Sequence, residues 1–266
     1  VWAWRAGRIR GIRRSVDRML CLLPFEPPIY AAAGVAAHYV GHPLAGTIDP
    51  AADRADARRS LDLPAQGPLL ALLPGSRAGE VRALGADFLD AAAGLRGEYP
   101  GLHCVIPAAD ATCRALLAPL LAARPSLSAT LVDGRSREAM AAADAVLAAS
   151  GTATLEAALM GRPLVVAYRT GRLSWAVLSR LVHLDHIALP NILAGRELAP
   201  EYLQAAVTPQ ALALALAPLL AGNAPSPMLA GFAALREELA VDFGALAADA
   251  ILELVEAGSA QDAGSV

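Results

Sequence analysis

Short apolar runs alternate with longer amphipathic stretches along most of this chain. Five of the runs predict buried strands, at residues 69–73, 103–107, 129–132, 145–149 and 164–167. Helical patterns fill the segments between these runs, and the chain from Thr208 onward is helical in pattern as well. Strands that alternate with helices are typical of an α/β fold, in which right-handed crossovers build a parallel sheet.

The segment from Leu69 to Glu80, LLALLPGSRAGE, joins a predicted strand to a predicted helix. Pro74 and Gly75 form the expected turn, and Ser76 is the expected N-cap of a helix over 78–96. A helix start offers backbone N–H groups and a positive dipole end, and Arg77 adds a charged, bidentate donor. The pattern therefore indicates a diphosphate site. An ordinary strand-to-helix turn with a surface arginine would give the same pattern.

A second turn of this kind lies at residues 144–156, with the sequence DAVLAASGTATLE. Ser150, Gly151 and Thr152 follow the strand over 145–149 and precede a helix over 154–160. In a doubly wound sheet, two such turns face one crevice at the carboxyl ends of the strands. Glu156 is placed to accept hydrogen bonds from ribose hydroxyls, or it is simply an acid near a helix start.

The composition excludes several classes of protein. The chain has 266 residues, of which 56% are hydrophobic, and all 22 of its basic residues are arginine. Without lysine there is no Schiff base and no GxxxxGK[ST] phosphate loop, and GxGxxG is also missing. No apolar run reaches the roughly 18 residues of a membrane span. Three cysteines without a CxxC pair fit a reducing cytoplasm.

Positive charge is concentrated at the N-terminal end. Six arginines and one aspartate lie within residues 1–20, although the whole chain has a net charge of −3. On a helical wheel Arg10, Arg13, Arg14 and Arg18 share one face. A basic amphipathic helix of this kind can lie on an anionic membrane surface, or it can be the solvated face of a helix that covers a core.

The N-terminal segment is too short to form a domain. Residues 19–23 and a run ending near residue 40 predict two strands, with a helix over 25–33 between them, and residues 44–52 resemble a linker. Such an open sheet would leave its apolar faces uncovered. We therefore expect residues 1–46 to be the last part of an N-terminal Rossmann-like domain whose first part is missing, and residues 47–266 to be a second domain. Residues 258–266 are expected to be a disordered tail.

Six motifs in order resemble those of lipid A disaccharide synthase, and the resemblance covers nearly the whole chain. They are VWAWR (1–5), LPFE (23–26), YVGHP (39–43), LLPGSRAGEV (72–81), ASGTATLE (149–156) and LPNILAGRELAPE (189–201). The resemblance implies an inverting glycosyltransferase of the GT-B type. Such an enzyme joins UDP-2,3-diacylglucosamine to 2,3-diacylglucosamine 1-phosphate at the inner face of the cytoplasmic membrane. The acceptor site and the general base would lie in the missing N-terminal part, so this chain alone is expected to be inactive and its catalytic residue is unknown.

For the part of the site that binds the sugar donor, the residue pattern and the resemblance predict the same residues. Ser76 and Arg77 are predicted to bind the diphosphate, Glu156 the ribose, and the turn at 150–152 phosphate or uridine. Asn191 and Arg196 are candidates for the donor sugar or diphosphate, although Asn191 as a helix cap and Arg196 in an ion pair are the alternatives. Helix N-termini with an arginine stabilise a leaving diphosphate without a metal, so neither a metal nor a cofactor is expected.

Two other functions share part of this pattern. A UDP-sugar 2-epimerase would have the same architecture and the same UDP site, although the VWAWR and LAGREL motifs argue against it. A noncatalytic module that binds UDP without turnover is the third possibility. The expected partners are the two acylated sugars and an anionic membrane surface. No nucleic acid partner is expected, and an oligomer is possible.

Overall fold

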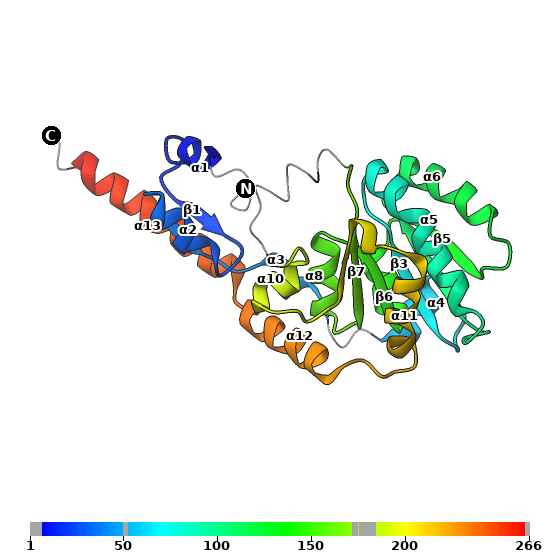
Figure 1. The fold of residues 1–266 in the computed structure, drawn as a ribbon. Coiled ribbons are helices and arrows are strands. Elements are labelled where there is room, and N and C mark those ends of the chain that lie inside the picture. The colour runs from blue at the N-terminus through cyan, green and yellow to red at the C-terminus, as the bar shows by residue number, and fades with distance from the viewer. Residues whose placement is uncertain (1–6, 50–52, 172–174, 176–184, 264–266) are drawn as a thin grey trace. The chain divides into compact units, whose positions relative to one another are not determined.

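The computed structural model describes residues 7–49, 53–171, 175 and 185–263, and these form two compact units. Of the described residues, the larger unit contains 49, 53–171, 175 and 185–235, and the smaller one contains 7–48 and 236–263 (Figure 1). The structure groups the C-terminal helix with the N-terminal segment. The division into residues 1–46 and 47–266 stays a prediction. VWAWR, one of the quoted motifs, lies outside the described residues.

The larger unit contains a six-stranded sheet whose paired strands are all parallel. Its strands are β3 (Leu69–Leu73), β4 (His103–Ala108), β5 (Ala129–Asp133), β6 (Ala145–Ala149), β7 (Leu164–Tyr168) and β8 (Glu201–Leu203). The spatial order is β5-β4-β3-β6-β7-β8, which is the doubly wound Rossmann order. The five predicted strands are confirmed to within one residue at each end. The sixth, β8, was not predicted.

Helices cover both faces of this sheet. They are α4 (Arg54–Ser60), α5 (Ala78–Leu95), α6 (Ala111–Ala122), α7 (Ser136–Ala142), α8 (Thr152–Leu159), α10 (Leu189–Ala194), α11 (Pro209–Leu220) and α12 (Ser226–Leu239). One layer contains α5, α6 and α11, which contact one another through α5, and the other contains α4, α7, α8 and α10. A short 3₁₀ turn, Gln204–Ala206, follows β8.

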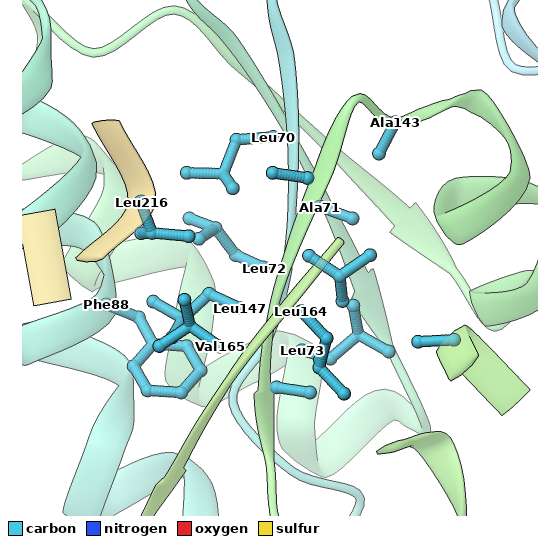
Figure 2. Close-up of a cluster of buried hydrophobic side chains, with 14 of the residues drawn as sticks. Leu70, Ala71, Leu72, Leu73, Phe88, Ala143, Leu147, Leu164, Val165 and Leu216 are labelled. Atoms are coloured by element: carbon cyan, nitrogen blue, oxygen red, sulfur yellow. The ribbon is translucent and has the colours of Figure 1, made fainter. Parts of the chain in front are cut away.

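Strand β3 lies inside the sheet and is buried on both faces. All five of its residues are buried. Figure 2 shows Leu70 and Leu72 on the side of Phe88 and Leu216, whereas Ala71 and Leu73 point to the opposite side. Successive side chains of a strand alternate between faces, so a strand with helices on both sides needs apolar residues at every position. This explains why the run LLALL identifies the strand in the sequence.

The smaller unit contains a two-stranded parallel sheet and short helices. Its elements are α1 (Gly7–Ile12), β1 (Met19–Cys21), α2 (Glu26–Ala32), β2 (Ala37–Tyr39), α3 (Pro43–Thr47) and α13 (Phe243–Ala263). A small core contains Ile9, Cys21, Tyr30 and Val35. The helix α3 falls within the expected linker. The expected disordered tail is wrong up to Ala263, because α13 continues to that residue.

The predicted basic helix is shorter than expected. Helix α1 ends at Ile12, so Arg13, Arg14 and Arg18 lie beyond it, and the side chain of Arg10 is outside the description. The guanidinium of Arg18 donates to the carboxylate of Glu253 at 2.7 Å and to the backbone oxygen of Ala250 at 2.8 Å. Arg18 therefore binds α13 instead of joining a common arginine face.

Among the helices of the described ranges, none is both long enough and apolar enough to cross a membrane.

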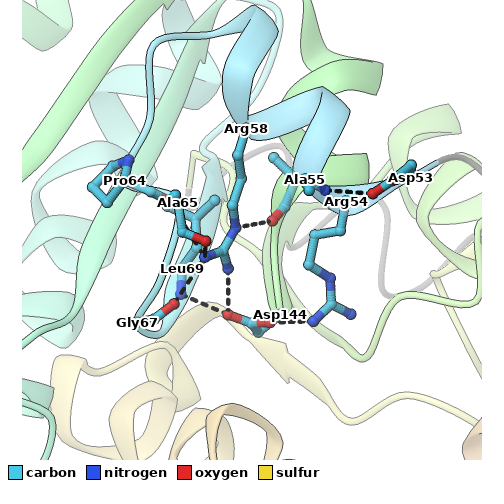
Figure 3. Close-up of polar contacts among 10 residues, drawn as sticks. Asp53, Arg54, Ala55, Arg58, Pro64, Ala65, Gly67, Leu69 and Asp144 are labelled. Atoms are coloured by element: carbon cyan, nitrogen blue, oxygen red, sulfur yellow. Dashed lines mark hydrogen bonds and ion pairs between the residues drawn. The ribbon is translucent and has the colours of Figure 1, made fainter.

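A buried arginine connects α4 to the sheet at the end where β3 and β6 begin (Figure 3). Nη2 of Arg58 lies 2.9 Å from Oδ2 of Asp144, and the same oxygen accepts the backbone N–H of Leu69 at 2.8 Å. Nε and Nη1 of Arg58 donate to the backbone oxygens of Ala142 and Gly67 at 3.1 and 3.0 Å. Arg54 forms a second ion pair with Asp144. One carboxylate thus joins α4 to the start of β3 and to the residue that precedes β6.

Replacing Asp144 by alanine tests this connection. The Arg58 side chain is only 6% exposed and would lose its carboxylate partner. Removing one partner of a buried ion pair costs about 3–5 kcal/mol of the free energy of unfolding. Chemical denaturation of Asp144→Ala measures this loss. The matched control is Asp56→Ala, which removes the exposed pair with Arg59 and should cost less than about 1 kcal/mol. Equal losses in the two variants would contradict the assignment.

Candidate active site

A cavity of about 590 Å³ opens at the carboxyl ends of the strands in the larger unit. It lies at the point where the strand order reverses, between β3 and β6, which is where doubly wound sheets bind ligands. Four strand-to-helix connections line it. The lining residues are Leu73, Gly75, Ser76, Arg77 and Glu80 after β3, Pro107 and Ala109 near the end of β4, Gly134 and Ser136 after β5, and Ala149, Ser150, Gly151, Thr152, Ala153 and Glu156 around β6 and α8.

The turn between β3 and α5 differs in detail from the prediction. Helix α5 begins at Ala78 as expected, but its N-cap is Arg77, not Ser76. The carboxylate of Glu80 accepts the backbone N–H groups of Ser76 at 3.0 Å and of Arg77 at 3.3 Å. A glutamate at the third helical position that bonds back to the N-cap is half of a capping box. The predicted anion donors thus have an intramolecular acceptor.

The side chain of Arg77 is exposed to solvent at the cavity. It is 81% exposed, and its Nη1 lies 2.9 Å from Oε1 of Glu80. Because both groups are accessible to solvent, an ion pair of this kind is weak and can exchange for another anion. Among the described residues that line the cavity, Arg77 is the only positively charged one.

The turn between β6 and α8 brings the other predicted residues to the cavity. Gly151 is the N-cap of α8 and has a φ of +149°, a conformation that favours glycine. No side chain of the described residues caps α8. The hydroxyl of Ser150 donates to the backbone oxygen of Ile187 at 3.2 Å. Ser150, Gly151 and Thr152 therefore present small groups and a helix start to the same space as Arg77.

Glu156 lines the cavity and is held by an arginine from α7. Nε and Nη2 of Arg137 lie 3.2 and 3.1 Å from Oε1 of Glu156. The glutamate side chain is only 14% exposed, whereas that of Arg137 is 46% exposed. Both donors engage the same oxygen, so the second oxygen of this carboxylate is the one available to a ligand.

Asn191 and Arg196 are not among the residues that line the cavity. Asn191 is fully buried, and its amide nitrogen donates to the backbone oxygen of Ala199 and to Glu201 at 2.8 and 2.7 Å. Its amide oxygen accepts the N–H groups of Leu198 and Ala199 at 2.8 and 3.0 Å. These four bonds use the whole hydrogen-bonding capacity of the amide. The structure thus gives Asn191 a structural role, and its contact with a ligand stays a prediction. Arg196 is exposed in the turn after α10.

Sequence reasoning missed several lining residues. Glu80 follows Arg77 by three residues, which is the spacing of a capping box and was a usable signal. Pro107 ends one further predicted strand, and Gly134 and Ser136 follow another. In a parallel sheet, those strand ends lie at the same edge as the first two turns. The order of the strands had to be known before these residues could be assigned to the cavity.

The three cysteines are not among the residues that line the cavity. Cys21, Cys104 and Cys113 are buried, and desolvation raises the pKa of the Cys104 thiol to about 12. A thiol with such a pKa stays protonated at neutral pH and is a poor nucleophile. Within the described residues, no group of three His, Cys, Asp or Glu side chains is arranged to hold a metal ion.

Comparison with known proteins gives one family. Residues 1–228 match the family model described as lipid-A-disaccharide synthetase. The chain is 54% identical over 256 residues to the lipid-A-disaccharide synthase of Pseudomonas aeruginosa strain LESB58. That alignment covers 96% of this chain and 67% of the relative.

Solved structures resemble the fold at low sequence identity. WaaG, a glycosyltransferase involved in lipopolysaccharide biosynthesis, has a TM-score of 0.52 at 19% identity, over 88% of this chain and 60% of WaaG. The UDP-GlcNAc 2-epimerase of Neisseria meningitidis, solved with UDP-GlcNAc, also scores 0.52, at 13% identity over 86% of this chain and 63% of the epimerase. These likenesses support the GT-B fold and do not distinguish a transferase from an epimerase.

The structural role of Asn191 is testable by replacing it with alanine. The substitution leaves buried backbone N–H and C=O groups of residues 198–199 without partners, and each unpaired group costs about 1–3 kcal/mol. We expect a clear loss of unfolding free energy, measured by chemical denaturation. Unchanged stability combined with weaker UDP binding would instead support the ligand role that the sequence suggested.

Proposed function

This chain belongs to the lipid-A-disaccharide synthase family, and from that premise we propose that its cavity binds the UDP part of the sugar donor. The family consists of glycosyltransferases of lipid A biosynthesis. In the proposed reaction, the donor UDP-2,3-diacylglucosamine passes its sugar to 2,3-diacylglucosamine 1-phosphate, and UDP leaves. We assign the larger unit to the donor side and residues 1–46 to the acceptor-side domain.

The observation that carries the proposal is the meeting of two strand-to-helix turns in one cavity. The turns after β3 and β6 both line it, and its volume of about 590 Å³ is in the range of small-ligand sites. Each turn leads into a helix N-terminus, where backbone N–H groups and the helix dipole favour phosphate oxygens. Arg77 adds a positive charge, and we infer that the second carboxylate oxygen of Glu156 accepts hydrogen bonds from ribose hydroxyls.

The chemistry that follows is stabilisation of a leaving group. When the bond between the sugar and the diphosphate breaks, negative charge develops on UDP. Preorganised N–H groups and a guanidinium at that position lower the barrier, since they interact more strongly with the developing charge than with the intact donor. The described residues of the cavity include no assigned general base. Activation of the acceptor hydroxyl is therefore left to a group outside this set.

An epimerase with the same fold is the second candidate function. The neisserial epimerase matches the structure as well as WaaG does, so the fold alone favours neither. The 54% identity to a lipid-A-disaccharide synthase favours the transferase. Incubation of the whole protein, with its acceptor-side domain, with UDP-GlcNAc alone and with the two acylated sugars together separates the functions. UDP release that requires both acylated sugars supports the transferase, and interconversion of UDP-GlcNAc without an acceptor supports the epimerase.

We also propose that the protein acts on the cytoplasmic side of the inner membrane as a peripheral protein. Acylated substrates lie at that surface, and Arg13 and Arg14 are exposed after α1. Arg18 is excluded from the membrane contact because it is bound to Glu253. The docking surface is therefore smaller than the arginine face expected from the helical wheel.

Arg77→Ala tests the donor site. Loss of a charge-assisted contact to the diphosphate should weaken UDP binding by about 1.5–3 kcal/mol, as measured by calorimetry on this chain. Uridine, which has no phosphate, should bind equally well before and after the substitution. Unchanged UDP affinity would refute the assignment, and an equal loss for uridine would reveal a folding defect.

Membrane docking is tested by the double variant Arg13→Glu, Arg14→Glu. Each arginine near an anionic surface is worth about 1 kcal/mol, so sedimentation with phosphatidylglycerol vesicles should fall strongly and should also fall with added salt. The control Arg59→Glu changes an exposed arginine of α4 and should sediment like the parent chain. Equal sedimentation of the double variant and the control would overturn the proposal.

A further inference from the structure

Glu80 holds the anion donors of the β3–α5 turn. Oε2 of Glu80 accepts the N–H groups of Ser76 and Arg77 at 3.0 and 3.3 Å, and Oε1 lies 2.9 Å from Nη1 of Arg77. These are the donors that the proposed function assigns to the diphosphate. A ligand phosphate and the Glu80 carboxylate therefore need the same three N–H groups.

The close approach of this carboxylate depends on Gly75. Gly75 has a φ of +126°, and a Cβ built on it would lie 2.5 Å from Oε2 and 2.3 Å from Cβ of Glu80. A residue with a side chain at position 75 would push Glu80 away from the turn. The glycine thus supplies the space in which the carboxylate bonds to the turn, and that space adjoins the cavity.

The charges of the cavity also favour competition between Glu80 and a diphosphate. Among the described lining residues, the charged ones are Arg77, Glu80 and Glu156, which give two carboxylates and one guanidinium. A diphosphate that entered while Glu80 kept its place would meet a like charge at short distance. The repulsion is relieved if Glu80 leaves the turn as the diphosphate arrives, because Glu80 is partly exposed and its side chain can rotate toward solvent.

We propose that Glu80 is an intramolecular competitor of the donor diphosphate. Its carboxylate caps the turn in the free protein, leaves when the diphosphate binds, and returns as UDP departs. Glu80 thereby lowers the affinity for every ligand that carries a diphosphate and leaves the affinity for an uncharged nucleoside unchanged. This inference rests on the proposed function, because it concerns the same cavity.

The test compares Glu80→Gln with the unsubstituted chain by calorimetry, using UDP, inorganic diphosphate and uridine. Glutamine keeps an oxygen that can accept from the turn but removes the charge, so we expect UDP and diphosphate to bind about tenfold more tightly, the equivalent of one weakened charge-assisted contact. Uridine binding should not change. If Glu80 only capped the helix and did not face the diphosphate, the substitution would leave the affinity for inorganic diphosphate unchanged.

The chain offers a matched control in α7. There Arg135 is the N-cap residue, and its Nε lies 3.2 Å from Oε1 of Glu138, which is the same three-residue spacing. Neither of these residues lines the cavity. Glu138→Gln should therefore leave the binding of all three ligands unchanged.

Two results are decisive for Glu80. Tighter binding of UDP and diphosphate to Glu80→Gln supports the role of Glu80 as a competitor. Unchanged or weaker binding to Glu80→Gln overturns that role, provided that Arg77→Ala still weakens UDP binding. If UDP does not bind the unsubstituted chain, the proposed function fails instead, which distinguishes the two failures. Should Glu80→Gln lose its circular dichroism signal, Glu80→Asp decides in the same way, since its shorter side chain removes the carboxylate from the turn.

Discussion

The reversal of strand order between β3 and β6 is the constraint on which the cavity depends. The connections after these two neighbouring strands lead to opposite faces of the sheet, α5 in one helix layer and α8 in the other. The ends of both strands are therefore left without a covering helix directly above them. Two glycine-containing turns face the resulting gap, and the ligand chemistry follows from their N–H groups more than from any single side chain.

The parts of the fold that depend on local pattern could be predicted from the sequence. The strand β3 is apolar at every position because helices cover both of its faces, and β6 has the same unbroken pattern. β8 has no such signal, since it is three residues long and begins with Glu201. The carboxylate of that residue accepts the N–H groups of Ile187 and Ala188. The partner of Arg18 could not be predicted from local pattern, because Glu253 lies 235 residues away in the sequence. The length of the basic helix could not be predicted from local pattern either.

The residues of the candidate site could likewise be predicted only where they depend on local sequence pattern. Arg77 and the turn at Ser150–Thr152 were found because they directly follow apolar strands. The role of Asn191 was not found, because its four hydrogen bonds involve residues seven to ten positions further along the chain. Arg137 reaches Glu156 from a different helix, across 19 residues. Contacts of this kind are decided by tertiary packing, which a single sequence does not display.

The shortness of β8 has a consequence for the solubility of the folded chain. β8 forms one edge of the six-stranded sheet, and an edge strand offers unpaired N–H and C=O groups to other chains. A strand of three residues presents few such groups, and the 3₁₀ turn that follows it at Gln204–Ala206 ends the extended backbone at once. An incoming strand would find too short a template for stable pairing. This edge of the sheet thus resists the edge-to-edge association through which exposed sheets aggregate.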